Sequence, residues 1–305
     1  MRSISVIIPT YQGENLLPRL FKSLRGQTLF PDFETIVLDS SSQDATPELA
    51  RAFGARVISI PKQEFNHGLT RTLGAKKAKG RYVVFLTQDT YLAHPKALER
   101  LLAPLQSAQV AASYGRQIAP PELGVLAQLH RLFNYPPRSR LISYRDRKTL
   151  GLRAVFASNS FAAYKRKALA QIGWFPALPA SEDMYAFARL LKQGFWVAYV
   201  ADAVVFHGHR LSLKEEFRRY VKIGSFHAQQ SWILQEFGYA QGEGWKYLRF
   251  MLPKLMRKAP FSLPYFFFQT LIRYAGYKWG QINAKKGKLH PKASAPERSK
   301  EPSFS

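Results

Sequence analysis

The chain has 305 residues and no cysteine, which excludes disulfides, thiolate metal sites and thiol catalysis, and which fits the cytosol. It carries 45 lysines and arginines against 20 aspartates and glutamates. This excess favours an anionic partner such as nucleic acid, an anionic membrane or a phosphorylated substrate, although a solubilising surface would account for the same charge. No stretch reaches the roughly 18 uninterrupted apolar residues that a membrane-spanning helix needs.

The first 115 residues alternate short apolar runs with helical patterns. Strands are expected at residues 3–8, 34–38, 56–60 and 82–86, and helices at 16–24, 47–53 and 70–78. Continuous apolar strands separated by helices predict a mostly parallel sheet that is covered on both faces. Ligands bind such sheets at the carboxyl ends of the strands. Tyr11, Asp39 and Asp89 follow three of these strand ends, so we expect them at one edge.

The pattern is less regular between about residues 115 and 210. Strands are expected at 153–157, 195–200 and 203–206, and a helix at 181–192. Ser181 is the expected N-cap of this helix, and Gly194 follows its end. After Leu211 the chain turns helical. Residues 285–305 are rich in lysine, proline, serine and glutamate without apolar periodicity, which predicts a disordered tail.

Two short segments point to phosphate chemistry. Arg71 stands near the start of an expected helix, and Asp89 stands at the end of an apolar strand. Arginine pairs with phosphate oxygens, and a carboxylate holds a hard divalent cation that bridges them. The two residues therefore predict a nucleotide-using enzyme with a metal-bridged diphosphate. The alternative for Arg71 is a solvated arginine on a helix face.

Several motifs in order resemble a known family. Segments 5–11 (SVIIPTY), 37–46 (VLDSSSQDAT), 87–89 (TQD) and 181–183 (SED) resemble family 2 glycosyltransferases. Segments 65–71 (FNHGLTR) and 85–89 (FLTQD) are similar to the bacterial rhamnosyltransferase branch, which uses dTDP-L-rhamnose to build cell-surface polysaccharide. The resemblance covers about residues 3–280. Members with near-identical motifs transfer other sugars, so a UDP-sugar donor is the alternative.

The resemblance implies the GT-A fold, an α/β, Rossmann-like nucleotide-diphospho-sugar transferase fold with a mostly parallel central sheet and a C-terminal helical extension. It implies a catalytic domain over residues 1–210, in which 1–115 bind the nucleotide sugar and 116–210 form the acceptor half. The reaction expected of this branch is an inverting sugar transfer. Residues 211–284 would form a basic, aromatic, helical region.

The resemblance also implies a donor site. In the family the loop after the first strand lies against the nucleobase, and the aspartate after the second strand recognises the base. The donor-binding residues expected on this ground are Pro9, Thr10, Tyr11, Glu14, Asp39, Arg71 and Gln88. Pro9 would equally serve as a strand-ending turn, and Asp39 as a turn or capping aspartate. Ser42 and Asp44, however, stand in better positions to cap the next helix.

Asp89 is the expected ligand of Mg²⁺ or Mn²⁺. The family pattern is Asp-x-Asp, but Thr87 replaces the first acid here, so diphosphate oxygens and waters would have to complete the shell. His207 stands where family members place a metal-binding histidine, with His209 as a rival. Histidine suits Mn²⁺ better than Mg²⁺. The alternative for either residue is a structural hydrogen-bonding histidine.

Asp183 is the candidate general base, because inverting transfer needs a carboxylate that removes the proton of the acceptor hydroxyl. Glu182 is the less favoured base and would orient the acceptor. The structural alternative is that both acids simply stabilise the first turn of a helix through its dipole.

From Arg210 onward the chain has 18 basic and 6 acidic residues, interleaved with many aromatic ones. Such helices suit the interface of an anionic bilayer without spanning it. The expected acceptor is a lipid-linked saccharide, and the expected location is cytoplasmic, peripheral on the inner face of the cell membrane. The alternative is a helical appendage that packs on the catalytic core.

Two other classes of function are weaker. A non-catalytic protein that binds nucleic acid or membrane would explain the net charge of +25 and the incomplete Asp-x-Asp, but no recognisable RNA- or DNA-binding motif is present. A nucleotidyltransferase would also use strand-end carboxylates and metal. The sequence, however, lacks a glycine-rich phosphate loop after the first strand.

Overall fold

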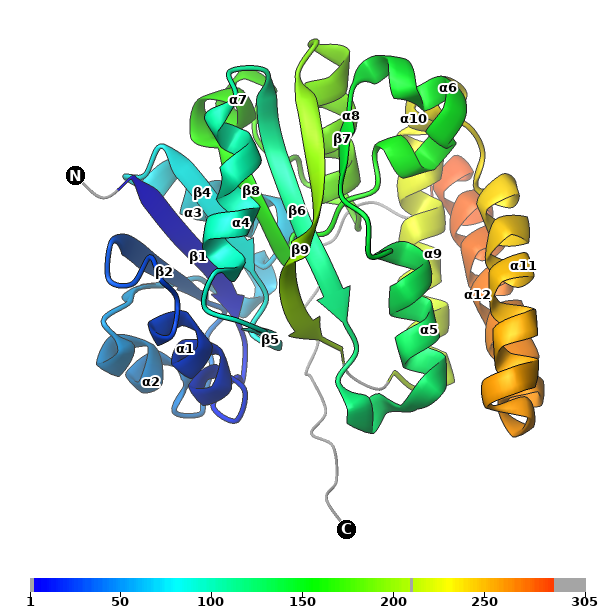
Figure 1. The fold of residues 1–305 in the computed structure, drawn as a ribbon, viewed down its shortest axis with the longest axis horizontal. Coiled ribbons are helices and arrows are strands. Elements are labelled where there is room, and N and C mark those ends of the chain that lie inside the picture. Colours follow the sequence, from blue (N-terminus) through cyan, green and yellow to red (C-terminus); the bar gives the residue numbers. More distant parts are fainter. Residues whose placement is uncertain (1–2, 209–210, 288–305) are drawn as a thin grey trace.

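The computed structural model describes residues 3–208 and 211–287, which form a nine-stranded mixed sheet with helices on both faces (Figure 1). The strands are β1 (Ile4–Thr10), β2 (Phe33–Asp39), β3 (Arg56–Ser59), β4 (Tyr82–Leu86), β5 (Thr90–Leu92), β6 (Val110–Ile118), β7 (Arg140–Ile142), β8 (Phe161–Lys165) and β9 (Trp196–His207). The helices are α1 (Leu17–Arg25), α2 (Thr46–Phe53), α3 (His67–Lys77), α4 (Ala97–Leu102), α5 (Gly124–Asn134), α6 (Arg147–Leu150), α7 (Arg166–Gln171), α8 (Glu182–Lys192), α9 (Leu213–Gln229), α10 (Ser231–Phe237), α11 (Ala240–Lys258) and α12 (Leu263–Lys285).

The strands follow the order β3-β2-β1-β4-β8-β6-β9-β5, and β7 also pairs with β9. β1 to β4 are parallel to one another, and β6 and β9 run in the same direction. β8 is inserted antiparallel between β4 and β6, and β5 and β7 pair antiparallel with β9. The mostly parallel sheet is therefore confirmed, and the carboxyl ends of β1, β2 and β4 lie at one edge.

The side chains of the parallel strands point alternately into two cores, which explains why these strands are apolar throughout. Val6 and Ile8 of β1 pack with α1 and α4 on one face, whereas Ile7 packs with α3 on the other. All three side chains are fully buried. A strand that is buried on both faces has no polar alternation, so the sequence pattern and the two-sided burial agree.

Some predicted elements differ in the structure. The expected strand at 153–157 is not formed: the 3₁₀-helix Gly151–Ala154 covers its first two residues and the rest is irregular, because the apolar side chains of Ala154, Val155 and Ala157 are buried in the core without a strand ladder. The two expected strands at 195–200 and 203–206 are one strand, β9, whose register against β6 shifts between Gly115 and Arg116. A bulge in one strand thus accounts for the interruption of the pattern.

Other differences concern the ends of helices. α3 begins at His67 rather than Thr70, because the Asn66 side chain caps it by accepting hydrogen bonds from the next turn. Ser181 occupies the N-cap position of α8 as expected, but its side chain makes no capping hydrogen bond and its φ is +59°. α12 ends at Lys285, where the disordered tail is predicted to begin; residues 288–305 of that tail, like His209, lie outside the described residues.

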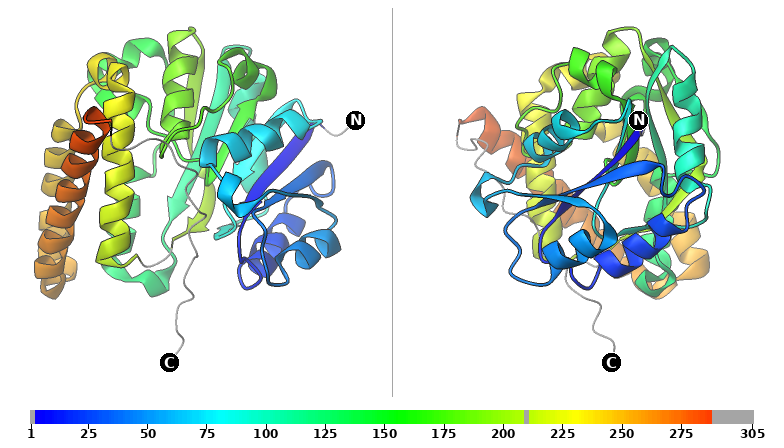
Figure 2. Two further views of the ribbon diagram at one scale, coloured as in Figure 1. Left: turned by 180° about the vertical axis from the view of Figure 1, so that it is seen from behind. Right: turned by 90° about the vertical axis from the view of Figure 1, so that its left-hand side faces the viewer.

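The C-terminal helices form a layer on one side of the sheet. α9 lies next to the sheet domain, and α11 and α12 lie side by side outside it (Figures 1 and 2). α12 approaches α9 closely at glycines: a Cβ atom added to Gly280 would lie 2.1 Å from the Val221 carbonyl oxygen. Within residues 3–208 and 211–287, we find no helix with the length and apolarity that crossing a membrane requires.

Candidate active site

The edge formed by the ends of β1 and β2 holds Asp39 firmly. Thr10 and Asp39 are paired in register, and the Thr10 hydroxyl donates to Asp39 Oδ1 at 3.1 Å. The hydroxyl of Ser42 donates to Oδ1 at 2.6 Å and its backbone N–H to Oδ2 at 3.0 Å. Asp39 is only 2% exposed. It therefore acts as a turn aspartate at the position predicted for base recognition, and these two roles are compatible.

The loop after β1 is tied to its neighbours by side chains that were expected to touch the donor. The Gln88 side chain accepts from the Tyr11 N–H at 2.9 Å and donates to the Tyr11 carbonyl at 3.0 Å. Glu14 accepts from the Ala45 N–H at 2.9 Å. The Lys62 ammonium contacts the Tyr11 hydroxyl. Gln88 and Glu14 thus fix the shape of this loop.

Asp89 and His207 lie together, as the metal-site prediction requires. Asp89 Oδ2 is 3.2 Å from His207 Nε2, because β5 begins directly after Asp89 and pairs Thr90 with His207. His207 Nδ1 is 2.7 Å from Gln117 Oε1. Metal-binding histidines usually have their second nitrogen held in this way. Gln117 was not predicted, because no strand was expected at residues 110–118, where β6 places it.

Asp89 and His207 fit a divalent cation only if the bound diphosphate and waters supply the other coordinating atoms. The described part of the chain contains no group of three or more histidine, cysteine, aspartate or glutamate side chains that could hold a metal ion. One carboxylate and one imidazole leave most of the shell of a divalent cation to diphosphate oxygens and waters. This matches the expectation drawn from Thr87 in the place of the first acid.

Arg71 is not a solvated arginine, because its side chain is only 5% exposed. Its guanidinium donates to Glu182 Oε1 at 2.9 Å and to the His67 carbonyl at 3.2 Å. Its Nε is buried without a hydrogen-bond partner among the described residues. Arg71 therefore connects α3 to the start of α8, where the candidate base lies.

Glu182 and Asp183 are adjacent in sequence but lie in different surroundings. Glu182 accepts hydrogen bonds from Arg71 and, at 3.0 Å, from the Asn159 side chain. Burial raises the pKa of the Glu182 carboxyl, but the charges of Arg71 and His67 outweigh it, so the pKa is lowered. Glu182 is therefore held ionised in an ion pair, which is unsuited to accepting a proton.

Among residues 3–208 and 211–287, no cation is a hydrogen-bond partner of the Asp183 carboxyl. Oδ2 accepts from the Asn159 N–H at 3.1 Å, and Oδ1 accepts from the Met184 N–H at 2.8 Å. Burial, and then the negative charge of Glu182, raise the pKa of Asp183 to about 7. A carboxylate with a pKa near neutrality is suited to general base catalysis. Asn159, which contacts both acids, was missed; its only signal is a polar run, 158–160, directly before an apolar strand.

Comparison with known proteins agrees with this geometry. The family model described as "Glycosyl transferase family 2" matches residues 5–173. The O-antigen chain rhamnosyltransferase RfbN of Salmonella typhimurium is 39% identical over 91% of this chain and 89% of its own length. WbaN of Salmonella anatum, also an O-antigen chain rhamnosyltransferase, is 38% identical over 92% of this chain and 90% of its own length.

Two solved structures share the fold. Mannosyltransferase PcManGT from Pyrobaculum calidifontis, in complex with GDP-Man and Mn²⁺, aligns with a TM-score of 0.66 and 17% identity over 94% of this chain and 88% of its own. S. aureus TarS 1-349 in complex with UDP-GlcNAc aligns with a TM-score of 0.55 and 16% identity over 94% of this chain and 93% of its own. The expected GT-A fold is confirmed. The chain is a glycosyltransferase that belongs to glycosyl transferase family 2, on the branch that includes the two Salmonella rhamnosyltransferases.

Proposed function

We propose that this enzyme moves L-rhamnose from dTDP-L-rhamnose to a lipid-linked saccharide during the synthesis of bacterial O-antigen polysaccharide, with inversion at the anomeric carbon. The sugar is supported by similarity to two O-antigen rhamnosyltransferases over about nine tenths of the chain. The observation that carries the mechanism is the geometry of two adjacent acids: Glu182 is held in a buried ion pair with Arg71, whereas Asp183 accepts backbone hydrogen bonds beside it, and burial together with the charge of Glu182 raises the pKa of Asp183.

In the proposed reaction the donor lies along the edge formed by β1, β2 and β4. Asp39 accepts the imide N–H of thymine, next to the loop of Pro9, Thr10 and Tyr11. The acceptor hydroxyl attacks the anomeric carbon from the face opposite the nucleotide while Asp183 Oδ2 or Oδ1 takes its proton. dTDP leaves with the electrons of the broken glycosyl–phosphate bond. Glu182 orients the acceptor rather than receiving the proton.

A divalent cation, Mn²⁺ or Mg²⁺, would be held by Asp89 and His207. Bound there, it would neutralise the charge that develops on the leaving diphosphate. Two observations support these ligands: the 3.2 Å approach of His207 Nε2 to Asp89, and the hydrogen bond from the other ring nitrogen to Gln117. The Mn²⁺ in the complex of the similar mannosyltransferase fits this proposal.

Membrane attachment through the C-terminal helices completes the proposal. α11, α12 and the 3₁₀ turn Pro260–Ser262 between them expose large apolar side chains, here called the aromatic surface: Trp245, Phe261, Phe267, Phe268, Leu271, Tyr274 and Trp279. Exposed Lys246, Arg249, Arg257 and Lys258 accompany them. Apolar anchors with basic neighbours favour the interface of an anionic bilayer. The enzyme would then work on the cytoplasmic face of the cell membrane.

The test is calorimetric binding of dTDP, UDP, GDP and CDP with and without Mn²⁺ or Mg²⁺, followed by transfer assays with the Asp183→Asn enzyme. We expect metal-dependent preference for dTDP, and a variant that binds donor normally but does not transfer sugar. Preference for UDP would favour the UDP-sugar alternative. Failure to bind any nucleotide would contradict the proposed donor site, and turnover by Asp183→Asn would remove this residue from the mechanism.

A further inference from the structure

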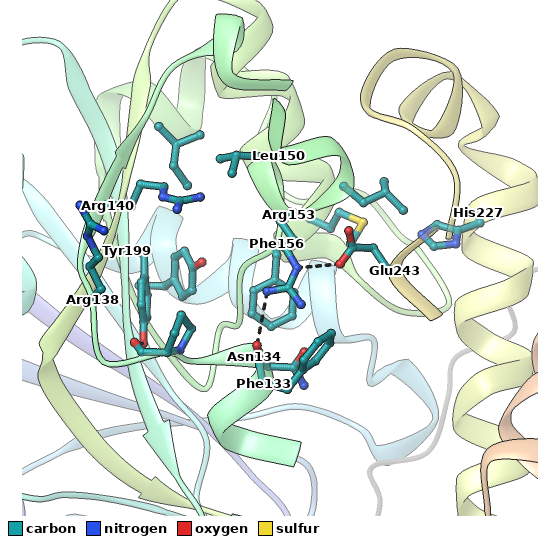
Figure 3. Close-up of a pocket in the computed structure, with 15 residues that line it drawn as sticks. Phe133, Asn134, Arg138, Arg140, Leu150, Arg153, Phe156, Tyr199, His227 and Glu243 are labelled. Carbon is teal, nitrogen blue, oxygen red and sulfur yellow. Dashed lines mark hydrogen bonds and ion pairs between the residues drawn. The ribbon is translucent and has the colours of Figure 1, made fainter. Parts of the chain in front are cut away.

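A cavity of about 400 Å³ lies beside the first turn of α8 (Figure 3). Its volume falls within the range of small-molecule sites, roughly 300–1,000 Å³. Met184 forms part of the wall, and its N–H is bonded to the carboxylate of the proposed base, Asp183. Asp183 itself does not line the cavity, so Met184 separates a molecule bound there from the proposed base.

Aromatic rings from several elements form one side of the cavity. Tyr114 of β6 lies 5.0 Å from the ring of Tyr199 of β9 and 5.9 Å from that of Phe156, measured between ring centroids. Tyr135 packs among these three rings, although it does not line the cavity itself. The rings, together with Ile142 and further aliphatic side chains, offer apolar surface to the C–H face of a sugar or to a hydrocarbon chain.

Two arginines at the cavity are available for an anion. Arg138 and Arg140 lie on the same side of it (Figure 3), and both are exposed. Neither guanidinium makes a hydrogen bond or ion pair with another of the described residues. Arg153, the third arginine of the wall, is instead bound to Glu243 at 2.6 Å. Arg140 also interacts electrostatically with the Asp146 carboxylate, which contributes to lowering the pKa of Asp146. Two guanidinium groups without hydrogen bonds to the described residues, beside an apolar cavity, favour phosphate oxygens on an amphiphilic ligand.

A buried polar atom in the wall lacks a partner. His227 of α9 is 5% exposed, and its Nδ1 lies 2.9 Å from the Tyr277 hydroxyl. Its Nε2 is buried without a hydrogen-bond partner among residues 3–208 and 211–287. Buried polar atoms are rarely left unsatisfied. Burial lowers the pKa of His227 to about 4, so the ring is neutral at pH 7. If the tyrosine donates to Nδ1, Nε2 carries the proton and can donate to a ligand oxygen.

We infer that the cavity holds the phosphorylated end of the acceptor, a saccharide joined through a diphosphate to a lipid. Arg138 and Arg140 bind the phosphate oxygens, the aromatic rings contact the sugar, and the sugar reaches Asp183 past Met184. The identity of the ligand rests on the proposed function, whereas the anion site rests on the lining residues alone.

The route for the lipid chain is consistent with this assignment. α11 supplies Glu243 to the cavity wall and, two residues later, Trp245 to the aromatic surface. Trp245 is 69% exposed. Arg138 and Arg140 lie across the cavity from Glu243 (Figure 3), so a hydrocarbon chain attached to phosphates at the two arginines would cross the cavity and leave along the start of α11, where it would meet the surface proposed to contact the bilayer. An acceptor could then be bound while its lipid stays in the membrane.

The donor also contains a diphosphate, so the experiment must separate the two sources. Geranyl diphosphate, a short lipid diphosphate, is titrated calorimetrically into the full chain saturated with dTDP and Mn²⁺. We expect binding to persist under saturation. Replacing either arginine, as Arg138→Gln or Arg140→Gln, should weaken it about tenfold, since a charge-assisted hydrogen bond is worth about 1.5 kcal/mol or more and 1.4 kcal/mol is tenfold.

The matched control is Arg51→Gln, which removes the same charge from an exposed position on α2. It should leave geranyl diphosphate binding unchanged, and geraniol, which lacks the phosphates, should show no dependence on either arginine. Displacement of geranyl diphosphate by dTDP, or equal affinity in the Arg138→Gln/Arg140→Gln enzyme, would overturn the inference. If the protein fails to bind dTDP, that result counts against the proposed function. The titration with geranyl diphosphate still tests whether Arg138 and Arg140 bind phosphate at the cavity.

Discussion

The buried ion pair between Arg71 and Glu182 should be the most costly single contact to break near the site. The two side chains are 5% and 7% exposed, and the joined atoms are 2.9 Å apart. At an effective dielectric constant of about 20 their attraction is about 6 kcal/mol. Removing one partner from a buried pair costs about 3–5 kcal/mol, because the other charge remains buried without compensation. We therefore expect Arg71→Met to lower the free energy of unfolding by about that amount.

The assay is urea unfolding followed by tryptophan fluorescence, applied to a double-mutant cycle. Glu182→Gln should cost less than Arg71→Met, because glutamine can still accept the hydrogen bond from Asn159. The double variant should be more stable than the sum of the single changes predicts, by about 0.5–3 kcal/mol. The matched control is the exposed pair Glu48–Arg51, for which the coupling should be at most about 1 kcal/mol.

Two results would refute this reasoning. One is an Arg71→Met protein whose stability lies within about 1 kcal/mol of the unmodified protein, which would place this pair among the weak surface pairs. The other is simple additivity of Arg71→Met and Glu182→Gln, which would mean that the two charges do not depend on each other.

Three further predictions concern the reaction and the C-terminal helices. Asp183 must be ionised to accept a proton, and its pKa is raised to about 7. The value of kcat/KM should therefore fall about tenfold per pH unit below pH 7 and level off above it. A profile that is flat from pH 5 to 8 would contradict the assignment of Asp183 as the general base. Gln117→Leu should raise the Mn²⁺ concentration needed for half-maximal activity by about 10- to 100-fold, because the His207 ring would lose the contact that orients it. An unchanged metal titration would show that Gln117 does not support the metal site. Gly280→Ala should separate α12 from α9, because the added methyl group would lie 2.1 Å from a carbonyl oxygen; faster hydrogen exchange confined to α12 is expected, and unchanged protection would contradict it.

The sequence predicted the nucleotide-binding half well, for physical reasons. Its strands are apolar because both faces are buried, and its helices end at signals such as Gly54, whose φ of +93° favours glycine. The acceptor half was predicted poorly. β6 and β8 contain alanines, such as Ala112 and Ala163, that are fully buried between neighbouring strands but have weak strand propensity. These segments form strands because they are buried in the folded protein, and the periodicity of apolar residues in the sequence does not reveal that burial.

The same limit applies to the site. Order along the chain placed Asp39 and Asp89 at strand ends, and the parallel topology brings those ends together. The order of residues along the chain could not predict contacts between distant segments. The hydrogen bonds of Asn159 with Glu182 and Asp183 are an example, because they depend on the antiparallel insertion of β8. The rival histidine, His209, lies outside the described residues, so the metal proposal uses His207, which pairs with Asp89 and contacts Gln117.

The different surroundings of two adjacent acids, Glu182 and Asp183, are the strongest argument for the mechanism. From residue type and position alone, Glu182 and Asp183 both suit the first turn of a helix and the helix dipole would explain either, although Asp183 is the acid that the sequence favours as the base. The fold separates them: Arg71 and Asn159 hold Glu182 as an anion, and that anion in turn disfavours ionisation of Asp183. Surroundings that drive two neighbouring pKa values apart are a mark of acid–base sites. An electrostatic role in the helix alone would require no such asymmetry, so the pair is better explained by catalysis, with Glu182 tuning Asp183.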